Sequence, residues 1–369
     1  MRLTVVSSID SLTRGQVCRA VAADRSGAVV VLHDLQGNGV VIRRIYRDGS
    51  LAERTETPLE HGCLACTVRL DVVPTVRALL ADGAGNVIVG LPPAVPSSAA
   101  VNALRKGIGS TLSVESVVLA CDPGSVEDQI WDRHTLFESG FTAKPEDNRT
   151  PGEFLIGEFA FADTVLLADP ELVPVDQDRQ ARGGQLVREL APHAAVCGTD
   201  GYRPAGHDPA EAAARAVPGS VRIPAAESDS AFTTVVHRLE RPLHPERFRH
   251  ALPKLAEGCC WVRGRLWIAS APRCRIAVSG VGPRVWLENT GPWLADRDSG
   301  PAAGNPHSVD AALDWHPVFG DRGTVVAITG EDVDGAGTAA LLAGCEVTDA
   351  EMATDPEAMS GPFEPSSTH

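Results

Sequence analysis

The sequence predicts an α/β protein in which a doubly wound, mostly parallel sheet is followed by a smaller α+β domain. Three observations support this fold class. The 369 residues exceed the usual size of one compact core, which favours two domains. Short apolar runs alternate with longer helical patterns through the first half of the chain, as in a parallel sheet covered by helices. After about residue 200 the pattern changes to successive strands, which indicates an antiparallel sheet.

The first half contains strands that are nearly continuous runs of Val, Ile and Leu. Such runs are typical of strands buried on both faces. The predicted strands are residues 3–6, 28–32, 86–89, 114–120, 164–167 and 194–196. The predicted helices are residues 13–23, 72–80, 99–106, 125–135 and 178–190.

Composition places the domain boundaries. Residues 1–200 are expected to form the first domain and residues 201–227, rich in Gly, Pro, Ala and charge, a linker. Residues 228–348 are expected to form the second domain, and the acidic residues 349–369 a disordered tail. The strands predicted in the second domain are residues 233–239, 260–269, 275–279, 284–287 and 323–329, and the helices are residues 245–256 and 335–342.

The charge balance restricts the possible partners. A formal net charge of −15 repels phosphate backbones, so autonomous DNA binding is not expected, although a ribosome could be reached through its basic proteins. No apolar run approaches the roughly 20 residues that span a bilayer, so no membrane association is expected. Nine cysteines at irregular spacing do not suggest a disulfide framework, which favours the cytoplasm.

The first strand leads into a turn where a nucleotide-binding α/β domain carries its phosphate loop. Such a loop needs glycines, a lysine that reaches the phosphates and a hydroxyl that binds Mg²⁺. Here Ser8 and Thr13 stand at the glycine positions, Arg14 at the lysine position and Gly15 at the hydroxyl position. Arg14 could still hold an anion, but the favoured interpretation is a plain strand-to-helix turn. Efficient GTP hydrolysis is therefore not expected.

The segment 60–69 carries a Cys-x-x-Cys pair, Cys63 and Cys66, before an apolar helix. It resembles the Gly-Cys-x-Cys-Cys-Thr/Ser-Val-Arg segment of CobW-type P-loop GTPases, a family tied to metal insertion and zinc homeostasis, with Ala65 replacing the middle cysteine. Two thiolates at this spacing can meet one Zn²⁺.

The remaining zinc ligands are open. His61 or Glu60 could provide a third ligand, and Cys121 or a partner a fourth. The alternative is that both cysteines are small apolar residues without metal, or form a redox pair at a helix N-terminus.

The resemblance to the CobW type extends over nearly the whole chain. Gly90 stands at the acidic position of the family's Glu-x-x-Gly-x-x-Pro segment, and Asp122 matches the aspartate that ends a strand. Residues 168–171 replace the guanine-reading Asn-Lys-x-Asp motif, where Glu171 could imitate its carboxylate. The tracts 241–248, 262–269 and 319–322 look like the CobW C-terminal domain. In the second tract, Arg263 and Arg265 alternate on a strand and are expected on a solvated face or an exposed basic edge.

Within the family the chain is most similar to an actinobacterial branch with a weakened phosphate loop. The resemblance implies a zinc-responsive adaptor that recruits a hibernation factor to the ribosome when zinc is scarce. One alternative is a GTP-dependent zinc metallochaperone in which Arg14, Asp122 and Glu171 serve the nucleotide and Asp34 binds Mg²⁺. The other alternative is a thiol redox protein using Cys63 and Cys66.

Overall fold

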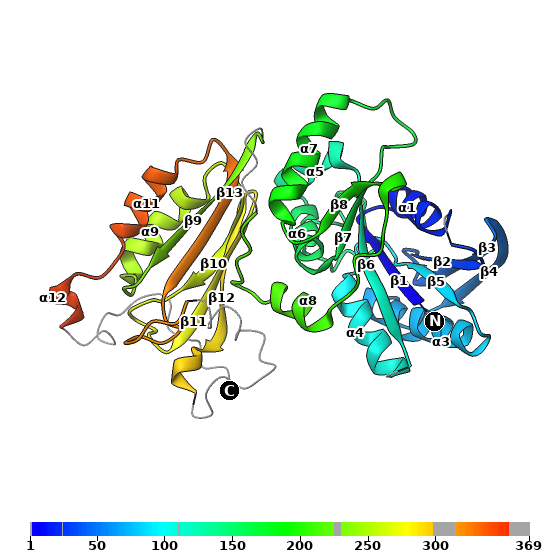
Figure 1. The fold of residues 1–369 in the computed structure, drawn as a ribbon, viewed down its shortest axis with the longest axis horizontal. Helices are drawn as coiled ribbons and strands as arrows, with labels where there is room; N and C mark the ends of the chain where they lie inside the picture. Colours follow the sequence, from blue (N-terminus) through cyan, green and yellow to red (C-terminus); the bar gives the residue numbers. More distant parts are fainter. Residues whose placement is uncertain (1, 24, 110, 225–229, 298–313, 354–369) are drawn as a thin grey trace. The chain divides into compact units, whose positions relative to one another are not determined.

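A computed structural model describes the chain except residues 1, 24, 110, 225–229, 298–313 and 354–369. It divides into two compact units, Met1–Asp208 and Pro209–His369. Each unit contains one sheet (Figure 1). Among the described residues, no helix is both long and apolar enough to cross a membrane.

The first unit is built on an eight-stranded sheet with the order β4-β3-β2-β5-β1-β6-β7-β8. The parallel part of the sheet contains six strands, β2, β5, β1, β6, β7 and β8. Strands β3 and β4 add an antiparallel edge beside β2. The strands are β1 (Arg2–Ser8), β2 (Ala28–Leu35), β3 (Val40–Arg47), β4 (Ser50–Pro58), β5 (Asn86–Gly90), β6 (Ser113–Cys121), β7 (Thr164–Leu167) and β8 (Ala195–Gly198).

Helices cover both faces of this sheet. Strand side chains alternate between the faces, so Val6 of β1 packs against Val17 and Val21 of α1, while Ser7 faces α6 and hydrogen-bonds Glu158. The helices are α1 (Ser11–Ala23), α2 (Leu64–Thr67), the π-helix η1 (Val68–Val72), α3 (Val73–Ala81), α4 (Ser97–Ile108), α5 (Pro123–Trp131), α6 (Pro151–Phe161), α7 (Gln177–Leu190) and the 3₁₀ helix η2 (Thr199–Gly201).

The structure confirms the six predicted strands of this unit and contains elements that were not predicted, among them β3, β4 and α6. Strands β3 and β4 form an edge hairpin in which β4 is mostly exposed and charged, so its sequence lacks the apolar run that marks an interior strand. Helix α6 extends through Phe161 and was not among the predicted helices. Its apolar residues occupy nearly every position, and periodicity alone does not separate such a helix from a buried strand.

The second unit contains a five-stranded antiparallel sheet with the order β12-β11-β10-β13-β9. These strands and the helices α9 and α11 match the predicted elements. The elements of the unit are α8 (Pro209–Arg215), β9 (Phe232–Leu239), α9 (Pro245–Ala256), β10 (Cys259–Leu266), β11 (Cys274–Val281), β12 (Arg284–Pro292), η3 (Leu294–Asp296), β13 (Thr324–Glu331), α11 (Gly335–Ala343) and α12 (Asp349–Met352).

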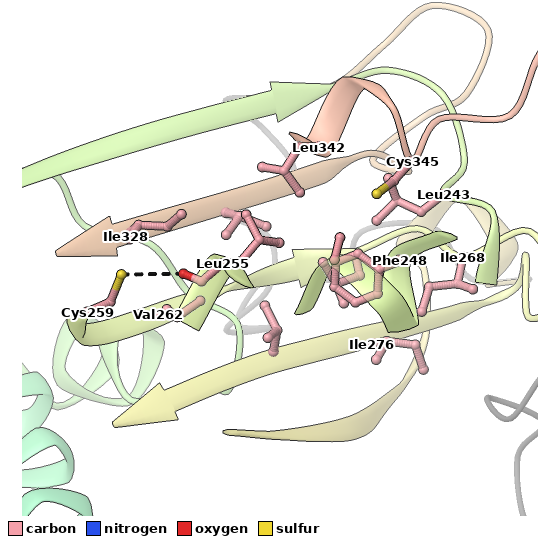
Figure 2. Packing of buried hydrophobic residues seen from close by; sticks show 14 residues of the cluster. Leu243, Phe248, Leu255, Cys259, Val262, Ile268, Ile276, Ile328, Leu342 and Cys345 are labelled. Carbon is pink, nitrogen blue, oxygen red and sulfur yellow. Dashed lines mark hydrogen bonds between the residues drawn. The ribbon is translucent and has the colours of Figure 1, made fainter. Parts of the chain in front are cut away.

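One face of the second sheet carries the core of the unit. Phe248 and Leu255 from α9 and Leu342 from α11 pack against Val262 of β10 and Ile328 of β13 (Figure 2). All five side chains are buried. This core is the reason why the two helices lie on the same face of the sheet.

The opposite face corrects the expectation that Arg263 and Arg265 lie on a solvated face or an exposed basic edge. Both side chains are buried. Arg263 donates to Thr329 Oγ1 at 2.9 Å and to the backbone oxygen of Arg222 at 3.0 Å, and Arg265 pairs with Asp314. Hydrogen-bonded partners make burial of these guanidiniums tolerable, and the partners lie far away in the sequence.

Two predicted segments contain short helices. Helix α8 lies within the proposed linker 201–227, and α12 begins the proposed tail. In α12, Thr348 and Glu351 form a capping box, and Glu351 pairs with Arg247 of α9 at 2.8 Å. Residues 354–369 lie outside the described part of the chain.

Candidate functional site: a filled phosphate position beside a cysteine pair

The turn after β1 is too short to surround a phosphate. Strand β1 ends at Ser8 and α1 begins at Ser11, so Ile9 and Asp10 alone connect them. The residues expected at phosphate-loop positions, Thr13, Arg14 and Gly15, already belong to helix α1. This confirms the interpretation as a strand-to-helix turn.

The start of α1 is occupied by a carboxylate of the chain itself. The backbone N–H groups of Leu12 and Thr13 donate to Asp10 Oδ1 at 2.9 and 2.8 Å. Free N–H groups and the helix dipole normally make a helix N-terminus an anion site. Here Asp10 supplies the anion, so an incoming phosphate would meet negative charge and donors that are already used.

Arg14 points into the protein, contrary to the expectation that it could hold an external anion. The residue is fully buried. Its Nη1 donates to the backbone oxygens of His33 and Leu91, both at 2.6 Å, and its Nη2 pairs with Asp34 Oδ1 at 2.7 Å. Two of the three guanidinium nitrogens therefore have internal acceptors, whereas Nε has none among the described residues.

The same ion pair removes Asp34 from its expected role in Mg²⁺ binding. Its other carboxylate oxygen pairs with Arg44 of β3, so two guanidiniums share one carboxylate. Gly90 makes this arrangement possible, because a Cβ there would lie 3.1 Å from Arg14 Cδ and 2.7 Å from a methyl carbon of Leu32. The absence of a side chain at position 90 thus leaves the space that the buried arginine occupies.

The other two expected nucleotide residues have structural partners. Asp122 caps α5 by accepting from Gly124 N at 3.0 Å and Ser125 Oγ at 2.6 Å, and it also accepts from Gln180 of α7 at 2.9 Å. Glu171 is exposed and pairs with Arg19 at 2.5 Å. Asp122 therefore holds two helices together, and Glu171 forms a surface ion pair.

A cleft of about 520 Å³ remains at the carboxyl edge of the sheet. Among the described residues that line it, Asp34 is the one with a charged side chain, and the lining also includes Ser11, Leu64, Pro92 and Phe141. Triphosphate binding depends on cations and backbone donors around the phosphates. This cleft presents a carboxylate instead, so the residues do not fit GTP with Mg²⁺.

Cys63 and Cys66 lie together beside this cleft. Cys63 is the N-cap of α2, and its Sγ accepts a hydrogen bond from Cys66 N at 3.1 Å. Both side chains are half-buried. The spacing, the helix start and the accessibility suit reactive or metal-binding thiols.

The two thiols differ in acidity. Burial acts to raise the pKa of Cys63, but hydrogen bonds from Cys66 and the backbone outweigh it and leave that pKa lowered. The pKa of Cys66 is raised, chiefly because its thiol donates to Cys63, with burial acting in the same direction. Cys63 is therefore the more acidic thiol of the pair.

Among the described residues, the structure adds no third ligand to this cysteine pair. No group of three or more His, Cys, Asp or Glu side chains in the described residues could hold a metal ion. His61, Glu60 and Cys121 therefore do not join the cysteines. Cys121 is fully buried, and burial raises its pKa. The donor chemistry fits zinc, but as half of a tetrahedral site.

A buried network supports the helix that follows the cysteines. In the π-helix η1, Asp71 lies 3.2 Å from His33 Nε2 and 3.3 Å from Arg43 Nη1. Burial lowers the pKa of His33. Burial opposes ionisation of Asp71, but His33 and Arg43 outweigh it and lower its pKa. His33 contacts Asp71 in the helix after the cysteines, and the next residue of β2, Asp34, pairs with Arg14. Strand β2 therefore contacts both the cysteine segment and the helix after the phosphate-loop turn.

Sequence reasoning missed this network and the role of Asp10. The aspartate just before a helical pattern is a detectable N-cap signal. His33, Arg43 and Asp71 have no local spacing pattern, because their contact depends on sheet pairing and on the placement of η1.

Comparison with known proteins agrees with the division of the chain into two units, because the family match lies within the second unit. Residues 232–346 match the cobalamin synthesis protein cobW C-terminal domain. The chain is 29% identical over 366 residues to zinc chaperone Rv0106 of Mycobacterium tuberculosis, covering 89% of this chain and 84% of that protein. It is 21% identical to zinc-regulated GTPase metalloprotein activator 1 of Dictyostelium discoideum, covering 84% and 70% of the two chains.

A solved structure was also found. The Zn(II)-bound YjiA GTPase from E. coli aligns over 94% of this chain and 99% of its own, with 11% identity and a TM-score of 0.36, a value too low to establish a shared fold. The family match covers the C-terminal domain, and the two relatives are similar to this chain along most of its length.

Proposed function

We propose that this protein is a zinc-handling adaptor in which the nucleotide domain serves as a scaffold without efficient GTP hydrolysis. One observation supports the absence of efficient GTP hydrolysis. Arg14 is buried in an ion pair with Asp34, so the cation and the expected magnesium ligand neutralise each other. The zinc part is supported by the thiol pair and by the names of two relatives, a zinc chaperone and a zinc-regulated GTPase metalloprotein activator.

Two thiolates suit zinc that is exchanged. Cys63 and Cys66 would supply two of the four usual ligands, and the remainder would come from water or a partner. A half-complete site binds more weakly than a closed structural site, and its affinity depends on pH because the thiols must lose protons. Such a site can respond to zinc availability or pass the ion on.

Competition with a chromophoric zinc chelator tests this site. We expect Cys63→Ser and Cys66→Ser each to weaken zinc binding by about tenfold or more, because each removes half of the protein's thiolate ligands. Cys274→Ser is the matched control, since Cys274 is also half-buried but lies in the second unit. Equal zinc affinity in all four proteins would exclude the cysteine site.

The finer role that we propose is recruitment of a hibernation factor to the ribosome under zinc limitation. It rests on the sequence resemblance to the branch described above. Affinity purification from zinc-starved and zinc-replete cells tests it, with the Cys63→Ser protein as the comparison. Recovery of ribosomal subunits and the factor in a zinc-dependent manner is the expected result, and their absence under both conditions would end this proposal.

A GTP-dependent metallochaperone is the second candidate, favoured by the name of the Dictyostelium relative. Titration with fluorescent GTP and Mg²⁺ separates it from the adaptor. We expect no saturable binding at micromolar protein, because the Asp10 carboxylate already occupies the N-terminus of α1 and Arg14 is already paired with Asp34. Micromolar affinity would replace the adaptor with an active GTPase.

A further inference from the structure

A second hollow lies on the first unit, separate from the cleft at the phosphate position. This groove of about 710 Å³ runs between the η1–α3 segment and α4. Leu64, Val68 and Val73 line one side, and Ala99 and Ala103 of α4 line the other. Cys66 also borders it. The small alanines leave room above an apolar floor.

The rim of the groove is basic. Arg69, Arg77 and Lys106 line it and are exposed. Within the described part of the chain none of the three forms an ion pair, and no carboxylate belongs to the lining. A fourth cation, Arg149, is neutralised by Asp147 at 2.6 Å. Three cations without a carboxylate partner among the described residues thus surround one apolar groove in a chain of net charge −15, and one of them, Arg77, also donates to the backbone oxygen of Gly107.

The residues that line the groove recur at helical spacing on two helical surfaces. Ala99, Ala103 and Lys106 are spaced by four and three residues, which places them on one face of α4. Arg69, Val73 and Arg77 are spaced by four residues each along η1 and α3. Along its length, the groove therefore has apolar surface in the middle and positive charge at the edges.

We propose that this groove binds an acidic amphipathic segment of another protein, whose apolar side chains enter between α3 and α4 and whose carboxylates pair with Arg69, Arg77 and Lys106. Charge complementarity and the apolar floor favour this occupant. The proposal does not depend on GTP or zinc binding. It gives the scaffold a docking surface next to Cys66, where a docked segment could approach the zinc pair.

Fluorescence anisotropy with designed probes tests the groove on the full-length protein. The probe is a labelled helical peptide with leucines on one face and flanking glutamates, and the matched probe carries glutamine in place of each glutamate. We expect the acidic probe to bind at least about tenfold more tightly at low salt, and this preference to shrink as salt screens the charges.

Variants locate the site. Lys106→Glu with Arg69→Glu should weaken the acidic probe by about tenfold or more, and Ala99→Trp should block binding by filling the groove. Arg105→Glu and Asn102→Trp are the controls, because both positions are exposed on α4 but do not line the groove. Circular dichroism confirms that each variant is folded, and chelator competition reports its zinc affinity separately.

The outcomes distinguish the possible occupants. Equal affinity for the acidic and glutamine probes, or equal loss in the lining and control variants, would overturn the proposal. Self-association of the wild-type protein in sedimentation velocity that disappears in the Lys106→Glu variant would assign the groove to a second copy instead. Groove binding with no zinc binding would leave this inference intact while removing the zinc adaptor function.

Discussion

Arg14 and Asp34, separated by 20 residues in the sequence, form a buried ion pair at the position where a P-loop protein holds phosphate and magnesium. A guanidinium with three internal acceptors is stable in the interior, whereas one without partners is not. The pair joins helix α1 to the end of strand β2 in the interior of the first unit.

Replacing Arg14 tests the structural importance of the pair. Arg14→Ala should lower the free energy of unfolding by about 3–5 kcal/mol, because it leaves a buried carboxylate and two carbonyls without a donor. Chemical denaturation measures the change. Arg19→Ala is the control, since its ion pair with Glu171 is exposed and should contribute less than about 1 kcal/mol. Similar effects of the two changes would contradict the buried pairing.

Gly90 should tolerate no side chain while Arg14 remains in place. A Cβ at this position would lie 2.7 Å from Leu32 Cδ2 and 3.0 Å from Cys18 Sγ, so Gly90→Ala should destabilise the protein by about 1–3 kcal/mol through overpacking. Gly37→Ala has open space around its Cβ and should change stability by less than about 0.5 kcal/mol. Thermal unfolding of both variants gives the comparison.

Asp10 should act as a helix cap that does not depend on its charge. Asp10→Ala should cost about 1 kcal/mol, because the N–H groups of Leu12 and Thr13 lose their acceptor, while Asp10→Asn should retain most of the stability. Urea denaturation measures both. Neither variant should gain GTP binding, because Arg14 stays buried. A gain of micromolar GTP affinity in Asp10→Asn would show that the cap alone had blocked the site.

The cysteine pair should be alkylated in a fixed order. Cys63 has the lowered pKa and Cys66 the raised one, so Cys63 forms thiolate at lower pH and should react first with iodoacetamide near neutral pH. Cys197, whose pKa is raised by burial, should react slowly. Tandem mass spectrometry over a pH series resolves the three sites. Faster modification of Cys66 would contradict the hydrogen-bond direction within the pair.

Glu158 should make stability depend on pH. It is buried, and burial raises its pKa above the ordinary carboxyl value despite hydrogen bonds from Ser7 and Ser97. The folded state therefore binds this proton more tightly than the unfolded chain. Stability from this group is complete below about pH 4.3 and falls by up to about 1.4 kcal/mol per pH unit as pH rises toward the folded-state pKa.

Glu158→Gln isolates this effect, because glutamine carries no titratable proton. The difference in unfolding free energy between wild type and variant should change with pH above about 4.3. Denaturation at a series of pH values measures it. A constant difference would show that Glu158 is ionised in the folded protein.

Part of the site was visible in the sequence. The absence of the phosphate-loop glycines, lysine and hydroxyl in residues 8–15 predicted the plain turn that the structure contains, because these requirements are local. The Cys-x-x-Cys spacing likewise placed two thiols together at a helix start. A third metal ligand could not be predicted from neighbours such as His61, because distance along the chain does not fix side-chain direction.

The contrast between the two domains follows the same principle. The interior strands and most helices of both units follow from local apolar periodicity, which the sequence alone contains, whereas the edge hairpin of β3 and β4 does not. The burial and the hydrogen-bond partners of the charged residues, in contrast, depend on the tertiary structure. Arg14 and Arg263 are buried because carbonyls, hydroxyls and carboxylates from distant segments converge on them. Such partners lie close only after the chain has folded, and an ion in the interior is stable only where they do.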